Sequence, residues 1–200
     1  MYEFIDGSIS KLKRRTQIAF NNSRLELLKS DELNLLQVKK ETNRLYKKLR
    51  EESEKFLKEL LEDLSDRLHF NKDEFPLEYF LEAISPVLLY SFNTETERKK
   101  SRHFESIVAI SDMSDPKALE EQKKETRYWN TQVEETAVDI EREVFIQSAK
   151  KRGVKKVQWI AREDGKVCEC CGDLDGKVFE IDNIPHRPHI GCRCWLKEVV

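Results

Sequence analysis

All five cysteines of this 200-residue chain lie between Cys168 and Cys194. Cys168 and Cys171 form a C-x-x-C pair, and His189 is followed by Cys192 and Cys194. A two-residue gap lets both thiolates of a tight turn face one Zn²⁺, and a second such group completes a tetrahedron. The spacing therefore predicts a structural zinc site made by Cys168, Cys171, His189 and either Cys192 or Cys194.

Spacing alone leaves the fourth ligand open, because His186 is a further nitrogen donor and Cys170 a further thiol. Cys170 is interpreted as a bystander. The chain starts without a basic segment followed by an apolar run, so we expect synthesis in a reducing cytosol, where metal binding is favoured over disulfides or unligated thiols. Four good protein ligands leave no open position for water or substrate, which disfavours a catalytic metal.

The segment from 154 to 200 is predicted to be a small β-rich module. Alternating apolar residues suggest strands over 154–161 and 178–181, and Asp-Gly dipeptides at 164–165 and 175–176 suggest turns. A unit of this size usually needs a metal, disulfides or a partner, because it buries too little apolar surface to offset chain entropy.

The rest of the chain is predicted to be helical, with an N-terminal helical region over 1–112. From 9 to 70 the chain contains no proline and is rich in Leu, Glu, Lys and Arg. One stripe keeps an apolar face at steps of three and four residues: Phe56, Leu57, Leu60, Leu61, Leu64 and Leu68. The fold class is thus mainly α with a small C-terminal β-rich zinc-binding module, an α+β arrangement.

Between 71 and 112 the pattern predicts a break at 71–76 and then a short apolar helix bent by Pro86. A polar connector is expected over 94–100.

The segment 113–153 is predicted to hold helices that lead into the C-terminal module. One helix is expected to open at Ser114, and a second at Thr131, where Thr-Gln-Val-Glu matches a capping box. Gly153 is expected to end the second helix in a left-handed conformation.

Net charge is only −2, so any affinity for nucleic acid has to come from a local patch. The densest basic patch is Lys150, Lys151, Arg152, Lys155 and Lys156. Such a patch is ordinarily a solvated surface. Its functional interpretation is contact with the phosphates of nucleic acid. Arg193, between two cysteines, is expected to pair either with a partner's carboxylate or with an internal one. Trp129, Trp159 and Trp195 are expected to pack in the core.

Two enzyme classes share part of this pattern. His103-Phe104-Glu105 followed by C-x-x-C is superficially similar to zinc deaminases, but Val167 stands where their signature has proline. HNH-like nucleases also join a C-x-x-C turn to a later His-rich segment, yet neither a following Asn nor a second C-x-x-C turn is present. The sequence predicts a protein that is not an enzyme.

The run from Trp159 to Phe179, with Cys168-Glu-Cys-Cys171 and Leu-Asp-Gly-Lys-Val-Phe, and the ending Pro188-His-Ile-Gly-Cys-Arg-Cys194 resemble the Mu-F-like phage minor head, or head-morphogenesis, proteins. The resemblance covers the chain from about Thr131 onward, and Cys170 is additional to the family pattern. It implies a protein made in the host bacterial cytoplasm and placed in the virion, inside the capsid head. Implied partners are the portal protein, other head proteins and packaged DNA, with no small-molecule substrate. No membrane partner is expected, because no apolar stretch approaches the roughly 18 to 20 residues needed to cross a bilayer. Some relatives carry further domains beyond this tail, so a chain ending at Val200 is expected to be a structural version.

Overall fold

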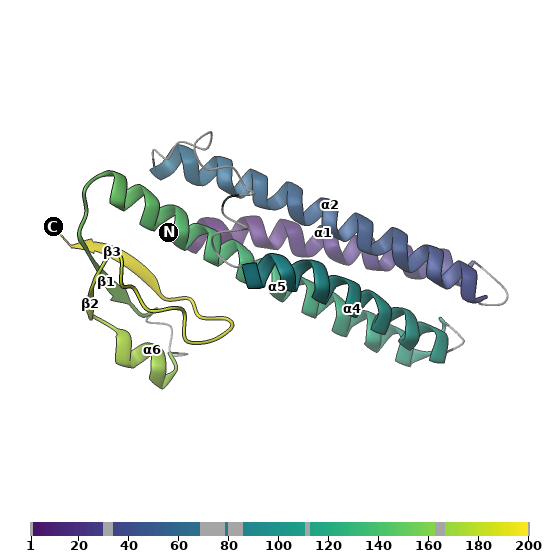
Figure 1. Cartoon of the computed structure of the whole chain (residues 1–200). Coiled ribbons are helices and arrows are strands. Elements are labelled where there is room, and N and C mark those ends of the chain that lie inside the picture. Colours follow the sequence, from purple (N-terminus) through teal and green to yellow (C-terminus); the bar gives the residue numbers. More distant parts are fainter. Residues whose placement is uncertain are drawn as a thin grey trace. The chain divides into compact units, whose positions relative to one another are not determined.

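The computed structural model describes residues 2–29, 34–68, 79, 86–110, 113–162 and 167–199. The chain forms two compact units (Figure 1). The first unit comprises Met1–Leu60 and Leu81–Glu134, and the second comprises Leu61–Phe80 and Glu135–Val200. Helices α2 (Leu35–Leu68) and α5 (Pro116–Lys151) contribute to both units. The mainly helical fold with a small C-terminal sheet confirms the predicted fold class.

The first unit is a bundle of α1 (Tyr2–Leu28), α4 (Pro86–Ile110) and the first parts of α2 and α5. Its core holds apolar residues that recur at helical intervals, as on α1: Ile9, Leu12, Phe20 and Leu27. Trp129 is buried, as predicted, and its Nε1 donates a hydrogen bond to Ser53 Oγ at 3.1 Å. The Trp129 ring also packs edge-on against Tyr46. Long-range contacts of this kind join α2 to α5.

The predicted helix over 9–70 is two helices, α1 and α2. Asn34 precedes α2, and its Oδ1 accepts the backbone N–H of Gln37 at 2.8 Å. This is an N-cap bond, which satisfies one of the free amides of a helix start. The sequence therefore contains an N-cap residue for α2, Asn34, but the helix-favouring composition on both sides made the two helices look like one.

The expected polar connector over 94–100 is wrong, because these residues lie inside α4. Pro86 is the first residue of α4, where its missing N–H costs nothing, rather than a bend within a helix. The expected break at 71–76 and the helix segment from 77 to 85 fall outside the described residues, apart from Tyr79.

The predicted helix start at Thr131 is also wrong, because α5 runs unbroken from Pro116 to Lys151. Thr131 Oγ1 donates to the carbonyl of Arg127, one turn back, instead of capping a new helix. The predicted end is confirmed: Gly153 has φ +81°, and Val154 N–H donates to Ala149 O at 3.0 Å. This bond and the one from Gly153 N–H to Lys150 O form the paired closure of a Schellman motif.

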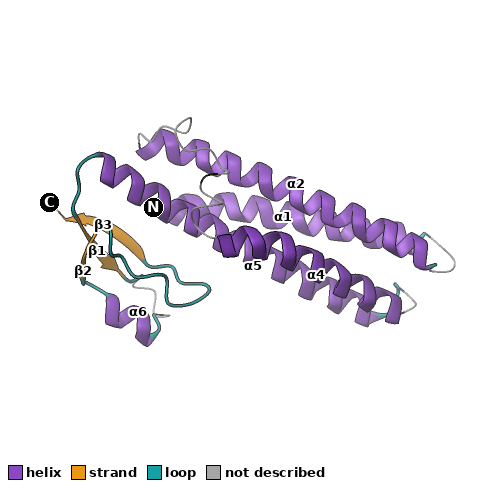
Figure 2. Ribbon diagram, in the orientation of Figure 1, coloured by secondary structure: helices purple, strands orange, loops and turns teal. Residues whose placement is uncertain are grey.

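The second unit contains the three strands, shown in orange in Figure 2. The sheet has the order β2-β1-β3, and β1 (Lys156–Ile160) pairs antiparallel with both β2 (Val178–Glu180) and β3 (Trp195–Val199). The register places Val157 opposite Phe179 and Glu198. Strands β1 and β2 fall where the sequence predicted them, whereas β3 was not anticipated. The Asp-Gly turn at 175–176 is observed, with Gly176 at φ +73°, and that at 164–165 lies outside the described residues.

Three of the cysteines belong to the hydrophobic core of the second unit. Cys171, Cys192 and Cys194 are buried in one cluster with residues of α5, of the strands and of the positions just after them: Phe145, Ala149, Val157, Trp159, Ala161, Ile181 and Leu196. Trp159 is fully buried, and the guanidinium of Arg142 lies 4.8 Å from the centre of its ring. The cysteine cluster is thus part of what holds the sheet to α5.

Candidate metal centre

Cys168 and Cys171 are positioned by the short helix α6 (Glu169–Leu174). Cys168 is the N-cap residue of this helix, and its Sγ accepts the backbone N–H of Cys171 at 3.4 Å. One turn of helix therefore turns both sulfur atoms toward the same point. Cys170 is exposed, which agrees with its interpretation as a bystander.

His189 brings an imidazole nitrogen to these two thiols. Its Nε2 lies 3.1 Å from Cys168 Sγ and 3.2 Å from Cys171 Sγ. On the other side of the ring, Nδ1 lies 2.8 Å from the carbonyl oxygen of Ile190, which can only accept a hydrogen bond. In the neutral imidazole, this contact places the proton on Nδ1 and leaves the Nε2 lone pair directed at the cysteines, the arrangement of a metal-binding histidine.

Cys192 and Cys194 approach from the segment that leads into β3. The Sγ atoms of Cys171 and Cys192 are 3.6 Å apart. Cys168, Cys171 and His189 form one group of three donors, and Cys171, Cys192 and Cys194 form another, with the donor atoms in each group within 4.8 Å of one another. A tetrahedral zinc with bonds of about 2.0 to 2.3 Å separates its ligands by roughly 3.5 to 3.8 Å, so the donors within each group are close enough to share an ion, and Cys171 belongs to both groups.

Burial and hydrogen bonding shift the thiol pKa values in different directions. The backbone N–H of Cys171 lowers the pKa of Cys168 by stabilising its thiolate. Burial raises the pKa of Cys171 and of Cys192. A divalent cation supplies the positive charge that buried thiolates need, and its binding releases their protons.

Arg187 holds the histidine-bearing segment against α5, and the sequence analysis did not identify it. Its side chain is 9% exposed and lies 2.9 Å from a Glu135 carboxylate oxygen and 2.7 Å from Asp139 Oδ1. It also donates to the backbone carbonyl of Cys192 at 3.2 Å. Planar, many-donor recognition of this kind is the particular property of arginine.

Gly191 is held by the same carboxylate. Its backbone N–H donates to Glu135 Oε1 at 2.7 Å, and its φ of +78° lies in the left-handed region that favours glycine. The chain therefore turns sharply between His189 and Cys192, and Glu135 fixes the turn. Ion pairs between residues about fifty positions apart cannot be recognised from local sequence periodicity. The one available signal was the position of Arg187, two residues before the candidate ligand His189.

The predicted basic patch at the end of α5 is partly neutralised. Three of its members form ion pairs within the second unit: Lys150 with Asp182, Arg152 with Glu198, and Lys156 with Glu180. Lys155 and Lys151 are exposed, and Arg193 is half-buried. The sequence predicted the clustering of positive charge but not the carboxylates that face it.

The residues of the two enzyme-like patterns lie in different surroundings. His103 is buried in the first unit beside Phe20 and Tyr46, while Glu105 is exposed and the cysteines belong to the second unit. His186 is exposed, and Nε2 of His189 faces thiols. Within the described residues, no helix combines the length and apolar character needed to cross a bilayer.

A family of known proteins matches more than half of this chain. The family model described as phage Mu protein F-like protein matches residues 96–197, which include α5, β1, β2, the start of β3 and every candidate ligand. No curated protein and no solved structure matches the chain. The match spans more than half of the sequence, and the chain therefore belongs to the phage Mu protein F-like family of head proteins.

Proposed function

We propose that this protein is a minor head protein of a phage, which associates with the portal vertex inside the head and supports assembly, DNA packaging or DNA release. Membership of the Mu F-like family supports a place in the head. The portal association is an inference from the family resemblance. A non-catalytic role fits the burial of Cys171, Cys192 and Cys194 in a hydrophobic core.

The proposed role of the C-terminal module is to present a rigid docking surface, held by one structural Zn²⁺. Cys168, Cys171, His189 and Cys192 are the proposed ligands, with Cys194 as the alternative to Cys192. The spacing of 3.6 Å between the Cys171 and Cys192 sulfurs supports this set, since it is close to a tetrahedral edge.

The convergence of these donors is the observation that carries the proposal. They come from α6, from the loop before Cys192 and from the segment entering β3, so one ion cross-links three segments of a small unit. Two apolar side chains beside the ligands are exposed, Ile190 at 71% and Val167 at 42%. Exposed apolar residues on a fixed frame are typical of a protein contact.

The test compares heads assembled with native protein and with the variants Cys171→Ser and Cys170→Ser. Cys170→Ser is the matched control, because it changes a neighbouring exposed thiol. We expect one zinc per chain and native incorporation for the control, and loss of both for Cys171→Ser. Ile190→Asp is expected to keep the zinc and lower incorporation.

Two outcomes of this test count against the proposal. Absence of the native protein from purified heads would contradict the proposed role in the head. Full incorporation of a metal-free Cys171→Ser protein would show that incorporation does not require the metal.

A second proposed function is contact with packaged DNA through the basic patch. Lys151 and Lys155 support it, because both side chains are exposed. Lys155→Glu should reduce the slope of log affinity against log salt by about one. An unchanged slope would assign the patch to solvated surface.

A further inference from the structure

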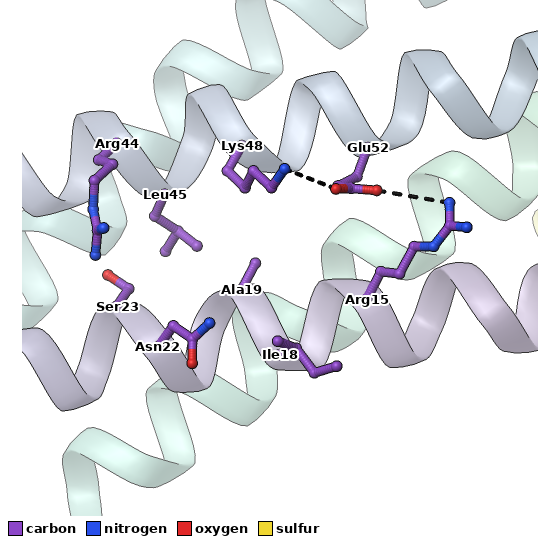
Figure 3. A pocket seen from close by; sticks show the side chains of 9 residues that line it. All are labelled: Arg15, Ile18, Ala19, Asn22, Ser23, Arg44, Leu45, Lys48 and Glu52. Carbon is purple, nitrogen blue, oxygen red and sulfur yellow. Dashed lines mark ion pairs between the residues drawn. The ribbon is translucent and has the colours of Figure 1, made fainter.

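A groove runs along the seam between α1 and α2 in the first unit. Two hollows of about 320 and 470 Å³ adjoin there, and both are lined by Asn22 and Arg44. Figure 3 shows the side chains of Ala19 and Leu45 pointing into the space between the two helices, with Arg15 reaching from α1 toward Glu52 of α2. The lining on α1 extends from Arg15 to Leu28, which is roughly 20 Å of helix.

The groove is bordered by large apolar side chains that the bundle leaves exposed. Ile18, Leu25 and Leu28 of α1 have exposed fractions of 49%, 54% and 38%. At about 100° per residue, Ile18 and Leu25 lie on the side of α1 opposite the buried Phe20 and Leu27. The helix therefore has a short apolar patch on the side that the bundle leaves uncovered. Neighbouring exposed apolar residues of this kind, flanked by charged ones, are typical of a protein contact.

Charge on the groove walls is mainly positive. Arg15, Lys29, Arg44 and Lys48 line it, against two acidic residues, Glu26 and Glu52. The cations are held by exposed pairs, such as Lys48 with Glu52 at 2.8 Å and Lys29 with Glu26 at 2.6 Å. Such pairs are individually weak, so a partner's carboxylates can share or replace them.

We propose that this groove binds an amphipathic helix of another protein, whose apolar face is flanked by acidic side chains. The shape supports a helix, because a long trough between two helices accepts the apolar residues of a third at positions i, i+3 or i+4, and i+7. The charge supports acidic flanks. The surface lies in the first unit and is separate from the metal centre of the second, so the two proposals stand independently.

Charge also argues against a second copy of the chain as the occupant. The side of α1 that carries Ile18 and Leu25 also carries Lys11, Arg14 and Lys29. Packing two such faces together would place like charges against each other in either orientation, which opposes association.

The test measures binding of the full-length protein to two synthetic helical peptides by fluorescence anisotropy. Both peptides are stapled, about 18 residues long, and share one leucine stripe. One has glutamates on both flanks of the stripe, and its twin has lysines. We expect the acidic peptide to bind about tenfold more tightly than its twin.

The variant Leu25→Glu places a negative charge in the groove and should weaken binding of the acidic peptide by about tenfold or more. Val108→Glu is the matched control, since Val108 is an exposed apolar residue on α4, with 39% exposure, outside the groove lining. It should leave binding within about twofold of native.

The proposal is overturned if neither peptide binds, if the two bind equally, or if the two variants weaken binding to the same extent. Sedimentation of the protein alone gives a further check. A dimer that Leu25→Glu abolishes would assign the face to a second copy instead.

Discussion

The two units maintain their structures by different means. The first unit is built from long helices, and most of the largest fully buried side chains belong to it, such as Phe20 and Leu49. Besides the ends of α2 and α5, the described part of the second unit has only strands of three to five residues and a six-residue helix, and cysteines make up part of its core. The first therefore depends on apolar packing, whereas the smaller apolar core of the second includes the residues of the proposed metal site.

The difference follows from how much apolar surface each segment can bury. A long amphipathic helix presents an apolar stripe along its whole length, so several helices bury a large area against one another. A three-stranded sheet of short strands buries less, and a bound metal adds folding free energy that does not depend on area. If the units depend on these separate sources of stability, a change that removes one source should leave the other unit folded.

Metal removal is expected to have the largest effect. A structural zinc contributes on the order of 10 kcal/mol at neutral pH, so chelation should unfold the sheet and α6 while α1 stays folded. Hydrogen exchange by mass spectrometry checks this, with loss of amide protection in β1 and β3 and retention in α1. Re-addition of zinc is the control and should restore protection. Unchanged exchange in β1 after complete metal removal would contradict the distinction.

The Arg187 network is expected to rank second. Arg187→Met leaves the carboxylates of Glu135 and Asp139 without their cation, a change that typically costs about 3 to 5 kcal/mol for a buried pair. Because Arg187 also holds the turn between His189 and Cys192, zinc affinity should fall about 10- to 100-fold in a chelator competition. Arg50→Met, which breaks an exposed pair with Glu54, is the control and should cost less than about 1 kcal/mol. Equal effects from the two variants would show that burial of the network is unimportant.

Truncation in the first core should lower stability without affecting the metal. Leu49 is 1% exposed, and Leu49→Ala should cost about 2 to 5 kcal/mol through lost burial and a cavity. Urea unfolding measures the stability, and elemental analysis of the folded variant should still find one zinc per chain. Loss of zinc together with stability would mean that the two units are energetically coupled.

The sequence predicted the features that depend on neighbours along the chain. Gly153 ends α5 because only local backbone bonds are involved, and the cysteines could be grouped because their spacing defines two close sets. The same local logic failed at Thr131, where a capping signature occurs within a helix that its tertiary contacts keep continuous.

Other features depended on contacts between distant residues and could not be predicted. Arg187 meets Glu135 and Asp139 about fifty residues away, and β3 gains its partners only when β1 lies beside it. Likewise, the apolar patch of Ile18 and Leu25 was indistinguishable from core residues until the bundle left it exposed. Periodicity shows that a face is apolar, but not whether this chain covers it.

Acid is expected to act on the two units in opposite directions, with the smallest effect of this series. Burial lowers the pKa of His103 in the first unit to about 4 and raises that of Glu141 in the second to about 7. The unfolded chain takes up a proton at His103 below about pH 6.5, while the folded bundle resists it until about pH 4. The contribution of neutral His103 to the free energy of unfolding is therefore fully present above pH 6.5 and is lost as the pH falls toward 4. The carboxyl of Glu141 stabilises its unit below about pH 4.5, and this contribution is lost as pH rises through 7.

The variant His103→Leu isolates the effect in the first unit. Among the described residues, the buried Nδ1 of His103 has no hydrogen-bond partner, so leucine should be tolerated at pH 8. Between pH 8 and pH 5 the native first unit should lose on the order of 2 kcal/mol more than the variant, measured from the hydrogen exchange of slow amides in α4. Exchange in α4 reports on the bundle without interference from protonation of the metal ligands. A native protein and variant with the same pH dependence would show that His103 is already protonated, or solvated, in the folded bundle.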